Sequence, residues 1–182
     1  IDEHGVIWPL ELTCRFGYPG FAILSALHVD GWDALFRTLL ERRTPRFATR
    51  PGFAVGVVLT VPPFPYAFGY AHVSKGLPIS FDPSLSAEDR AHLHYAEVAL
   101  HEGQLVASGA TGYLMVATGV GETVRGAQRA AYARAGKVYV PNVRYRHDIG
   151  DTLATGGIET LRALGYWDDD AVPREPAKSS RR

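Results

Sequence analysis

The hydrophobic period of the chain changes at a polar connector, and this change constrains the fold more than any other feature. Before the connector, "FAILSALHVDGWDALFRTLLERR" has apolar residues every three or four positions, which predicts two helices that meet at Asp30-Gly31, with Asp30 as the cap of the second. After the connector "TPRFATRPG", the apolar and β-branched run "FAVGVVLTV" predicts a strand. The two patterns predict structural units on either side of the connector.

Short strand-like segments and one helix make up the second unit. "GLPISF" and "GYLMVATG" are predicted strands, and "AHLHYAEVALHEGQLVASG" predicts two strands joined by a turn at Glu102-Gly103. "GETVRGAQRAAYARAGKV" is Ala-rich and predicts a long helix that stops near Gly136. The expected fold class is α+β, in which a small antiparallel sheet with barrel character carries one long helix across it.

The patterns divide the chain into four segments. Residues 1–44 contain a strand and two helices, residues 53–150 the strand-rich unit, residues 151–167 a terminal helix, and residues 168–182 a polar tail that we expect to be disordered. The strand-like pattern "HGVIWPLELTCRF" begins almost at Ile1. A domain that starts within a strand leads us to expect further sequence upstream.

Composition excludes several classes of protein. Nineteen basic and nineteen acidic residues cancel, so the chain lacks the charge expected of a partner for nucleic acid or an anionic membrane. No apolar run approaches the roughly 20 residues that span a bilayer, and no signal-peptide pattern is present. The single cysteine, Cys14, fits a reducing compartment. We therefore expect a cytoplasmic protein with small-molecule or protein partners, including assembly as a homo-oligomer.

A polar row follows one face of the first predicted strand. In "PLELTCRFGYPG", Glu11, Thr13 and Arg15 alternate with apolar residues, so their side chains project from the same face. A carboxylate beside a hydroxyl oxygen offers the hard ligands that Mg²⁺ prefers when it also binds phosphates. The alternative is an ion pair between Glu11 and Arg15 on a solvated sheet, and spacing alone favours that interpretation.

Histidines gather in the strand-rich unit. His92, His94 and His101, together with Glu97 and Glu102, suggest a metal site, but alternation along a strand places His101 on the face opposite the other two histidines. Scattered surface histidines are the simpler interpretation.

Two further motifs have structural explanations. "TGVGET" (residues 118–123) has glycines before a helix, but it matches neither dinucleotide-binding nor Walker A spacing, so it indicates a strand-to-helix turn. His147-Asp148 could form a proton relay, and a polar segment that folds back over the sheet explains the pair equally well.

The order of the motifs resembles the glycinamide ribonucleotide synthetase (phosphoribosylamine–glycine ligase) family of ATP-grasp ligases. "LELTCRFGYPG" is similar to the family strand E-x-N-x-R and its continuation R-F-G-D-P-E. "KGLPISF", "GQLVASGATGYLMVATG" and "RYRHDIG" are similar to later family motifs in the same order, so the resemblance covers roughly residues 7–150. The motifs are weak one by one, and their common order makes the resemblance specific.

The chain departs from the family pattern at several positions. Thr13 replaces an Asn, Tyr18 an Asp and Gly20 a Glu, and "GAT" at residues 109–111 replaces "GGR". Threonine still offers one oxygen to a metal ion, whereas neither tyrosine nor glycine replaces a carboxylate. The departures put the substrates in doubt more than the fold.

The resemblance implies a fold, a reaction and a site. Residues 1–44 would end an ATP-grasp core, and residues 53–150 would form the small C-terminal domain of a ligase of purine biosynthesis, which joins a carboxylate to an amine through an acyl phosphate. ATP and Mg²⁺ are the implied cofactors: Glu11 and Thr13 would bind the metal, Glu11 and Arg15 the nucleotide, and Arg15 would take part in catalysis.

The family segments that bind the nucleotide would lie upstream, so this chain would not be active alone. Those upstream segments would be its partner. The alternative is a non-catalytic binding or assembly module derived from the same family.

Overall fold

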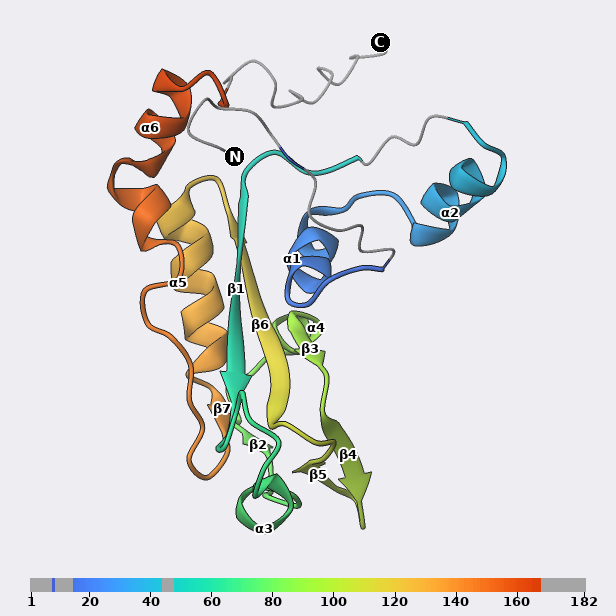
Figure 1. Ribbon diagram of the computed structural model, residues 1–182, viewed down its shortest axis with the longest axis vertical. Coiled ribbons are helices and arrows are strands. Elements are labelled where there is room, and N and C mark those ends of the chain that lie inside the picture. Colours follow the sequence, from blue (N-terminus) through green and yellow to red (C-terminus); the bar gives the residue numbers. More distant parts are fainter. Residues whose placement is uncertain (1–7, 9–14, 44–47, 168–182) are drawn as a thin grey trace.

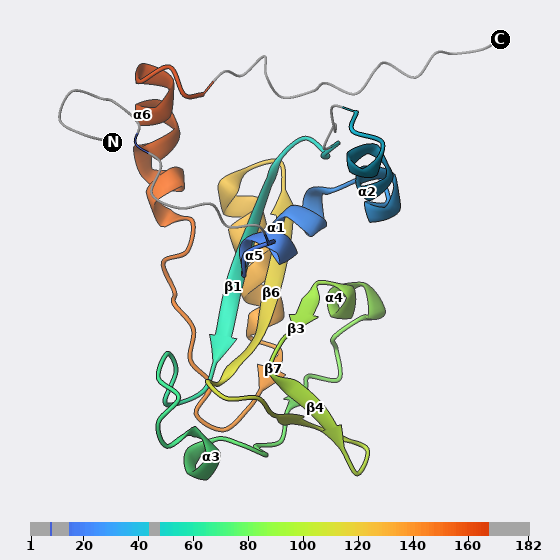
Figure 2. The ribbon, with the colours of Figure 1, turned by 45° about the vertical axis from the view of Figure 1, so that its right-hand side comes forward.

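The computed structural model describes residue 8, residues 15–43 and residues 48–167. Figures 1 and 2 show two long strands, β1 and β6, side by side, with helix α5 on one face and helix α1 on the other. The strands are β1 Phe53–Thr60, β2 Ser80–Phe81, β3 Leu93–Tyr95, β4 Val98–His101, β5 Gln104–Ala107, β6 Tyr113–Gly121 and β7 Val138–Tyr139. The helices are α1 Gly20–Leu27, α2 Trp32–Leu40, α3 Tyr70–Val73, α4 Ala87–Ala91, α5 Val124–Ala135 and α6 Ile158–Ala163, the last preceded by a kinked segment, η1 Leu153–Gly157.

All strand pairs are antiparallel, as the sequence predicts. In the described part of the chain the strands form three separate sheets, β1-β6-β3, β2-β7 and β4-β5. Single bridges at Pro78–Val106 and Thr60–Arg144 link these sheets. The described strands therefore do not form the single closed sheet that barrel character would require.

The two predicted N-terminal helices are present, but their junction differs in detail. α2 is capped by the extended backbone of Gly31, without a side-chain cap, so the prediction that Asp30 caps this helix is wrong. Asp30 lies one residue before the N-cap position of α2.

Helix α5 lies directly against the backbone of β6. A methyl group added at Gly119 would lie 2.3 Å from the carbonyl oxygen of Ala127, and one added at Gly121 would lie 2.6 Å from the Ala127 nitrogen. The facing residues of α5 are also small, and Ala127 and Ala131 are fully buried. Small residues on both sides therefore allow the helix and strand backbones to approach more closely than larger side chains would permit.

Helix α1 packs on the opposite face of the same two strands. Gly56 of β1 leaves room for Ile23 of α1, because a Cβ atom at Gly56 would lie 2.5 Å from Cγ1 of Ile23. The side chain of Val116 of β6 also lies beside Gly56. The β1–β6 pair is thus covered on both faces, which explains why Val57, Leu59 and Val116 are fully buried.

Residues 151–167 contain a short helix, as predicted. α6 covers only Ile158–Ala163 of the predicted "IETLRALGYW". In both ribbon views α6 lies beside the N-terminal end of α5. Over the ranges that the structure describes, we find no helix with the length and apolar character needed to cross a membrane.

The close approach of α5 predicts that Gly119 cannot be replaced without a large loss of stability. Gly119→Ala should lower the free energy of unfolding by about 3 kcal/mol, because the new methyl group overlaps backbone atoms of α5 that cannot move independently. Gly20→Ala is the matched control, since nothing lies within 4 Å of the added group. Equal stability of the two variants in chemical denaturation would contradict the packing described.

Candidate functional site

The predicted metal and nucleotide site lies at the N-terminal edge of the described residues. Glu11 and Thr13 are outside the described ranges, and Arg15 opens the range 15–43 with an exposed side chain. The structure therefore locates Arg15 but does not bring it together with Glu11 or Thr13. Their predicted roles remain predictions.

An aromatic cluster fixes the residue that follows Arg15. The ring of Phe16 lies 5.0 Å from that of Phe21, 5.6 Å from Trp32 and 6.3 Å from Phe36, measured between ring centroids. These partners belong to α1 and α2. Aromatic pairs at such distances stabilise beyond simple burial, so the backbone beside Arg15 is anchored to both helices.

Tyr18 extends from the same turn toward the sheet. Its ring lies edge-on to Tyr113, at 6.1 Å between centroids, and Tyr113 in turn lies 5.8 Å from Phe64. The hydroxyl of Tyr113 is buried without a hydrogen-bond partner among the described residues. This burial, together with a smaller electrostatic effect of Tyr18, raises the pKa of Tyr113 to about 12. The turn that carries Arg15 is thus joined to the first residue of β6 through aromatic rings.

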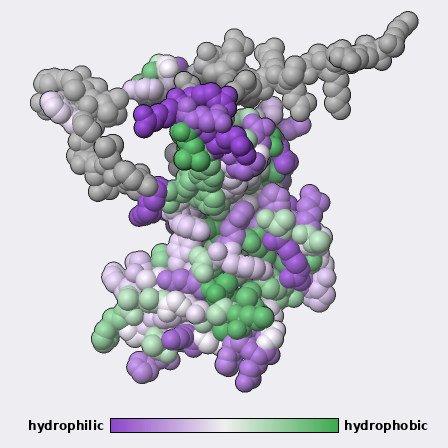
Figure 3. All heavy atoms as spheres, turned by 90° about the vertical axis from the view of Figure 1, so that its right-hand side faces the viewer, coloured by the Kyte–Doolittle hydropathy of each residue, from purple (hydrophilic) through white to green (hydrophobic). Residues whose placement is uncertain are grey.

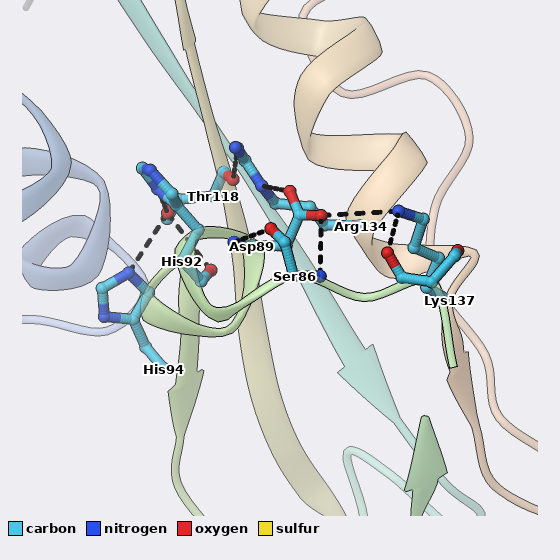
Figure 4. Close-up of polar contacts among 8 residues, drawn as sticks. Ser86, Asp89, His92, His94, Thr118, Arg134 and Lys137 are labelled. Atoms are coloured by element: carbon cyan, nitrogen blue, oxygen red, sulfur yellow. Dashed lines mark hydrogen bonds and ion pairs between the residues drawn. The ribbon is translucent and has the colours of Figure 1, made fainter. Parts of the chain in front are cut away.

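A buried threonine binds two histidines beside α1. Nδ1 of His92 lies 3.0 Å and Nε2 of His94 3.1 Å from Oγ1 of Thr118, which is fully buried in β6 (Figure 4). The backbone oxygen of Thr118 accepts a hydrogen bond from Arg134 of α5 at 2.8 Å, and Arg134 also forms a 3.0 Å ion pair with Asp89. Strands β3 and β6 and helices α4 and α5 therefore meet in one polar network.

The charges of this network follow from its contacts. Burial lowers the pKa of both His92 and His94. The neighbouring Arg134 guanidinium and the His94 ring lower the pKa of His92 further. The carboxylates of Glu88 and Asp89 oppose this shift. The hydrogen bond from Arg134 holds the pKa of Asp89 at about 2, with Ser86 and Lys137 contributing. The shared contact of both rings with the Thr118 hydroxyl connects β3 to β6.

The sequence favoured scattered surface histidines over a metal site, and the structure corrects that interpretation for His92 and His94, which are half-buried and bound to Thr118. His92 and His94 do share a face, as predicted, and His101 lies apart on β4. Among the described residues no group of three or more His, Cys, Asp and Glu side chains could hold a metal ion. Glu102 forms the hairpin turn with Gly103, at φ values of 49° and 82°.

Glu97 organises a loop instead of binding a metal. Its carboxylate accepts hydrogen bonds from the backbone N–H groups of Thr111 at 2.8 Å, Gly112 at 2.7 Å and Tyr113 at 3.3 Å, and from the Thr111 hydroxyl at 2.9 Å. Burial alone would raise the pKa of Glu97, but the hydrogen bonds from Thr111 and Gly112 lower it below the ordinary value. The "GAT" segment, 109–111, is thus part of a loop that an internal carboxylate holds in place.

The two remaining motifs have structural roles. "TGVGET" is the predicted turn from β6 to α5, in which the hydroxyl of Thr123 accepts a hydrogen bond from Gly126 N–H and caps the helix. Asp148 forms a two-point ion pair with Arg146, and the ring of His147 packs on those of Tyr132 and Tyr145. The carboxylate of Asp148 is thus bound to Arg146, which does not favour a relay with His147.

The histidine pair predicts that stability decreases in mild acid. Burial lowers the pKa of both histidines in the folded chain, so in mild acid the unfolded chain binds more protons than the folded chain does. The free energy of unfolding is therefore highest above the ordinary histidine pKa of 6.5, and it decreases as the pH falls below that value. Between about pH 7 and pH 5, denaturation should show this loss for the wild type and a weaker loss for the His92→Gln/His94→Gln double variant. His101→Gln is the control, and an unchanged pH profile of the double variant would contradict the assignment.

Comparison with known proteins connects this fold to one family. A protein-family model described as "Phosphoribosylglycinamide synthetase, C domain" matches residues 54–152, which is more than half of the chain. A phosphoribosylamine–glycine ligase of Pseudomonas aeruginosa is 34% identical over 154 residues, and one of Ralstonia nicotianae is 30% identical over 161 residues. Each match covers 82% of this chain, and the chain spans 34% of the length of each of these two relatives.

A solved structure gives the same result. The crystal structure of the phosphoribosylamine–glycine ligase from Thermotoga maritima matches with a TM-score of 0.60 and 30% sequence identity, over 74% of this chain and 31% of that chain. The mixed helix and strand fold with small antiparallel sheets is similar in the two proteins. These findings confirm the family resemblance drawn from the order of the motifs.

Proposed function

The chain belongs to the family of phosphoribosylglycinamide synthetase C domains, and from that premise we propose that it is the C-terminal part of an ATP-dependent carboxylate–amine ligase. The observation that carries the proposal is the family match over residues 54–152, together with relatives that are named phosphoribosylamine–glycine ligases. In the proposed reaction, the terminal phosphoryl group of ATP passes to a substrate carboxylate and ADP leaves. The substrate amine then attacks the acyl carbon and displaces phosphate, which forms an amide.

The donor set of the predicted strand fits Mg²⁺ and phosphate. Glu11 and Thr13 carry the carboxylate and hydroxyl oxygens that a magnesium ion accepts, and the exposed Arg15 guanidinium matches a phosphate or carboxylate with its planar fork. Mg²⁺, when bound, would neutralise charge on the phosphates. We propose Glu11 and Thr13 as metal ligands, Glu11 and Arg15 as nucleotide-binding residues, and Arg15 as a catalytic residue.

The exposed apolar surface of α1 and α2 supports contact between these helices and further segments of an ATP-grasp core. No residue of α2 is buried, although the helix is strongly apolar on one face. The exposed large apolar side chains here are Phe16, Leu24, Phe36, Leu39 and Leu40. Figure 3 views the molecule from the side of α2 and shows hydrophobic residues on this surface next to hydrophilic ones. An apolar surface of this kind fits contact with upstream segments of an ATP-grasp core, and a second copy of the chain would also suit it.

A non-catalytic binding or assembly module is the second candidate. It is favoured by Tyr18 and Gly20, which replace carboxylates of the family pattern, because Tyr18 uses its ring in packing against Tyr113. A side chain with this packing role does not supply the negative charge that an amine substrate would meet. The two candidates differ in whether the protein binds ATP with Mg²⁺.

Titration of the natural full-length protein with ATP and Mg²⁺ in a calorimeter tests the proposal. Glu11→Ala should weaken binding at least tenfold, about 1.4 kcal/mol, because the metal loses a carboxylate ligand. Glu88→Ala, on the exposed first turn of α4, is the control and should bind as the wild type does. A folded wild type that binds no ATP would contradict the ligase and support the binding module.

A further inference from the structure

A carboxylate is bound inside the loop that leads into β6. Oε2 of Glu97 accepts hydrogen bonds from three successive backbone N–H groups, and Oε1 accepts a fourth from the Thr111 hydroxyl at 2.9 Å. The backbone donors are Thr111 at 2.8 Å, Gly112 at 2.7 Å and Tyr113 at 3.3 Å. Successive N–H groups that converge in this way form a concave anion-binding site, called a nest. Residues 111–113 therefore have the donor set of an anion site, and the Glu97 side chain fills it.

The backbone conformation of the loop fits this role. Gly112 has a φ of 87°, and a left-handed residue within a turn directs neighbouring N–H groups to one side. Glycine adopts this conformation readily because it has no Cβ atom. Gly109 leaves room for the carboxylate, since a Cβ atom there would lie 2.7 Å from Cδ of Glu97. Two glycines thus shape the loop around the bound anion.

The hydrogen bonds of the loop stabilise the negative charge of Glu97. In the part of the chain that the structure describes, no cationic side chain forms an ion pair with Glu97. Burial raises the pKa of Glu97, but the hydrogen bonds from Thr111 and Gly112 bring it below the ordinary value. Glu97 is only partly buried, so a small solute can reach the nest when this side chain is absent.

The backbone of Glu97 is fixed on both sides of its side chain. Its N–H group donates to the carbonyl oxygen of Tyr113 at 3.0 Å, and its own carbonyl oxygen accepts from the N–H group of Ser108 at 2.9 Å. The attached carboxylate therefore has a high effective concentration at the nest. A free anion should not displace it from the natural chain.

We propose that residues 111–113 form a binding site for a small carboxylate, and that Glu97 is its built-in ligand. When the Glu97 side chain is absent, a free carboxylate such as formate takes its place on the same N–H groups. No residue of this site belongs to the proposed metal and nucleotide site. The proposal is thus independent of the ligase function, and its test contains neither ATP nor Mg²⁺.

Amide hydrogen exchange in the natural full-length protein tests the proposal at the donors themselves. Glu97→Ala should raise the exchange rate of amides 111–113 about tenfold or more, because hydrogen bonds to a charged group are lost. Sodium formate should restore slow exchange in a saturable manner. Formamide, a neutral molecule of similar shape, and sodium chloride at the same ionic strength should leave exchange fast.

Two variants separate a filled nest from an empty one. Glu97→Gln keeps a side chain of the same length in the nest without its charge, so formate should not change the exchange of amides 111–113. Glu88→Ala removes an exposed carboxylate from the first turn of α4. This control should show the slow exchange of the wild type, with and without formate.

Three results would overturn the proposal. Formate fails to slow exchange in Glu97→Ala, formamide or chloride slows it equally, or Glu97→Gln responds to formate as strongly as Glu97→Ala does. If Glu97→Ala is unfolded, circular dichroism replaces exchange as the measurement. Formate should then restore the fold and formamide should not, and an unfolded protein in saturating formate would also overturn the proposal.

Discussion

The close contact between α5 and β6 is the interaction on which the rest of the structure depends. Gly119 and Gly121 have no side chains to separate the strand from the helix, and the alanines of α5 meet them. At this distance Arg134 of α5 reaches the backbone oxygen of Thr118, and its guanidinium also binds Asp89. The packing of small residues therefore places a charged group where it connects the helix to the strand and to α4.

The other face of the same strands carries the residues with functional potential. Helix α1 packs on β1 and β6, the turn before it holds Arg15, and the Tyr18 ring contacts Tyr113 at the start of β6. The His92 and His94 rings meet Thr118 from the same sheet. One face of the β1–β6 pair thus contributes stability through α5, whereas the other holds the turn that carries Arg15, which we propose as a nucleotide-binding residue.

Local signals in the sequence were sufficient for much of the fold. The helix between Thr123 and Gly136 and the hairpin at Glu102-Gly103 depend on neighbouring residues, so propensity and turn geometry predict them. The contacts of Glu97 with Thr111 and of Arg134 with Asp89 join residues 14 and 45 positions apart, and spacing along a strand or helix carries no signal for them. The sequence favoured scattered surface histidines, and this interpretation was wrong for His92 and His94, because the threonine hydroxyl that they share becomes their neighbour only through folding.

Native-state amide hydrogen exchange tests most directly whether the segment carrying Arg15 is fixed to the family domain. If α1 is locked on the β1–β6 pair through Ile23 and Gly56, its amides should be protected nearly as well as those of α5. The amides of α2, which buries no residue, should exchange faster. Exchange of α1 at the rate of α2 would contradict the account, because the turn that holds Arg15 would then move independently of the sheet.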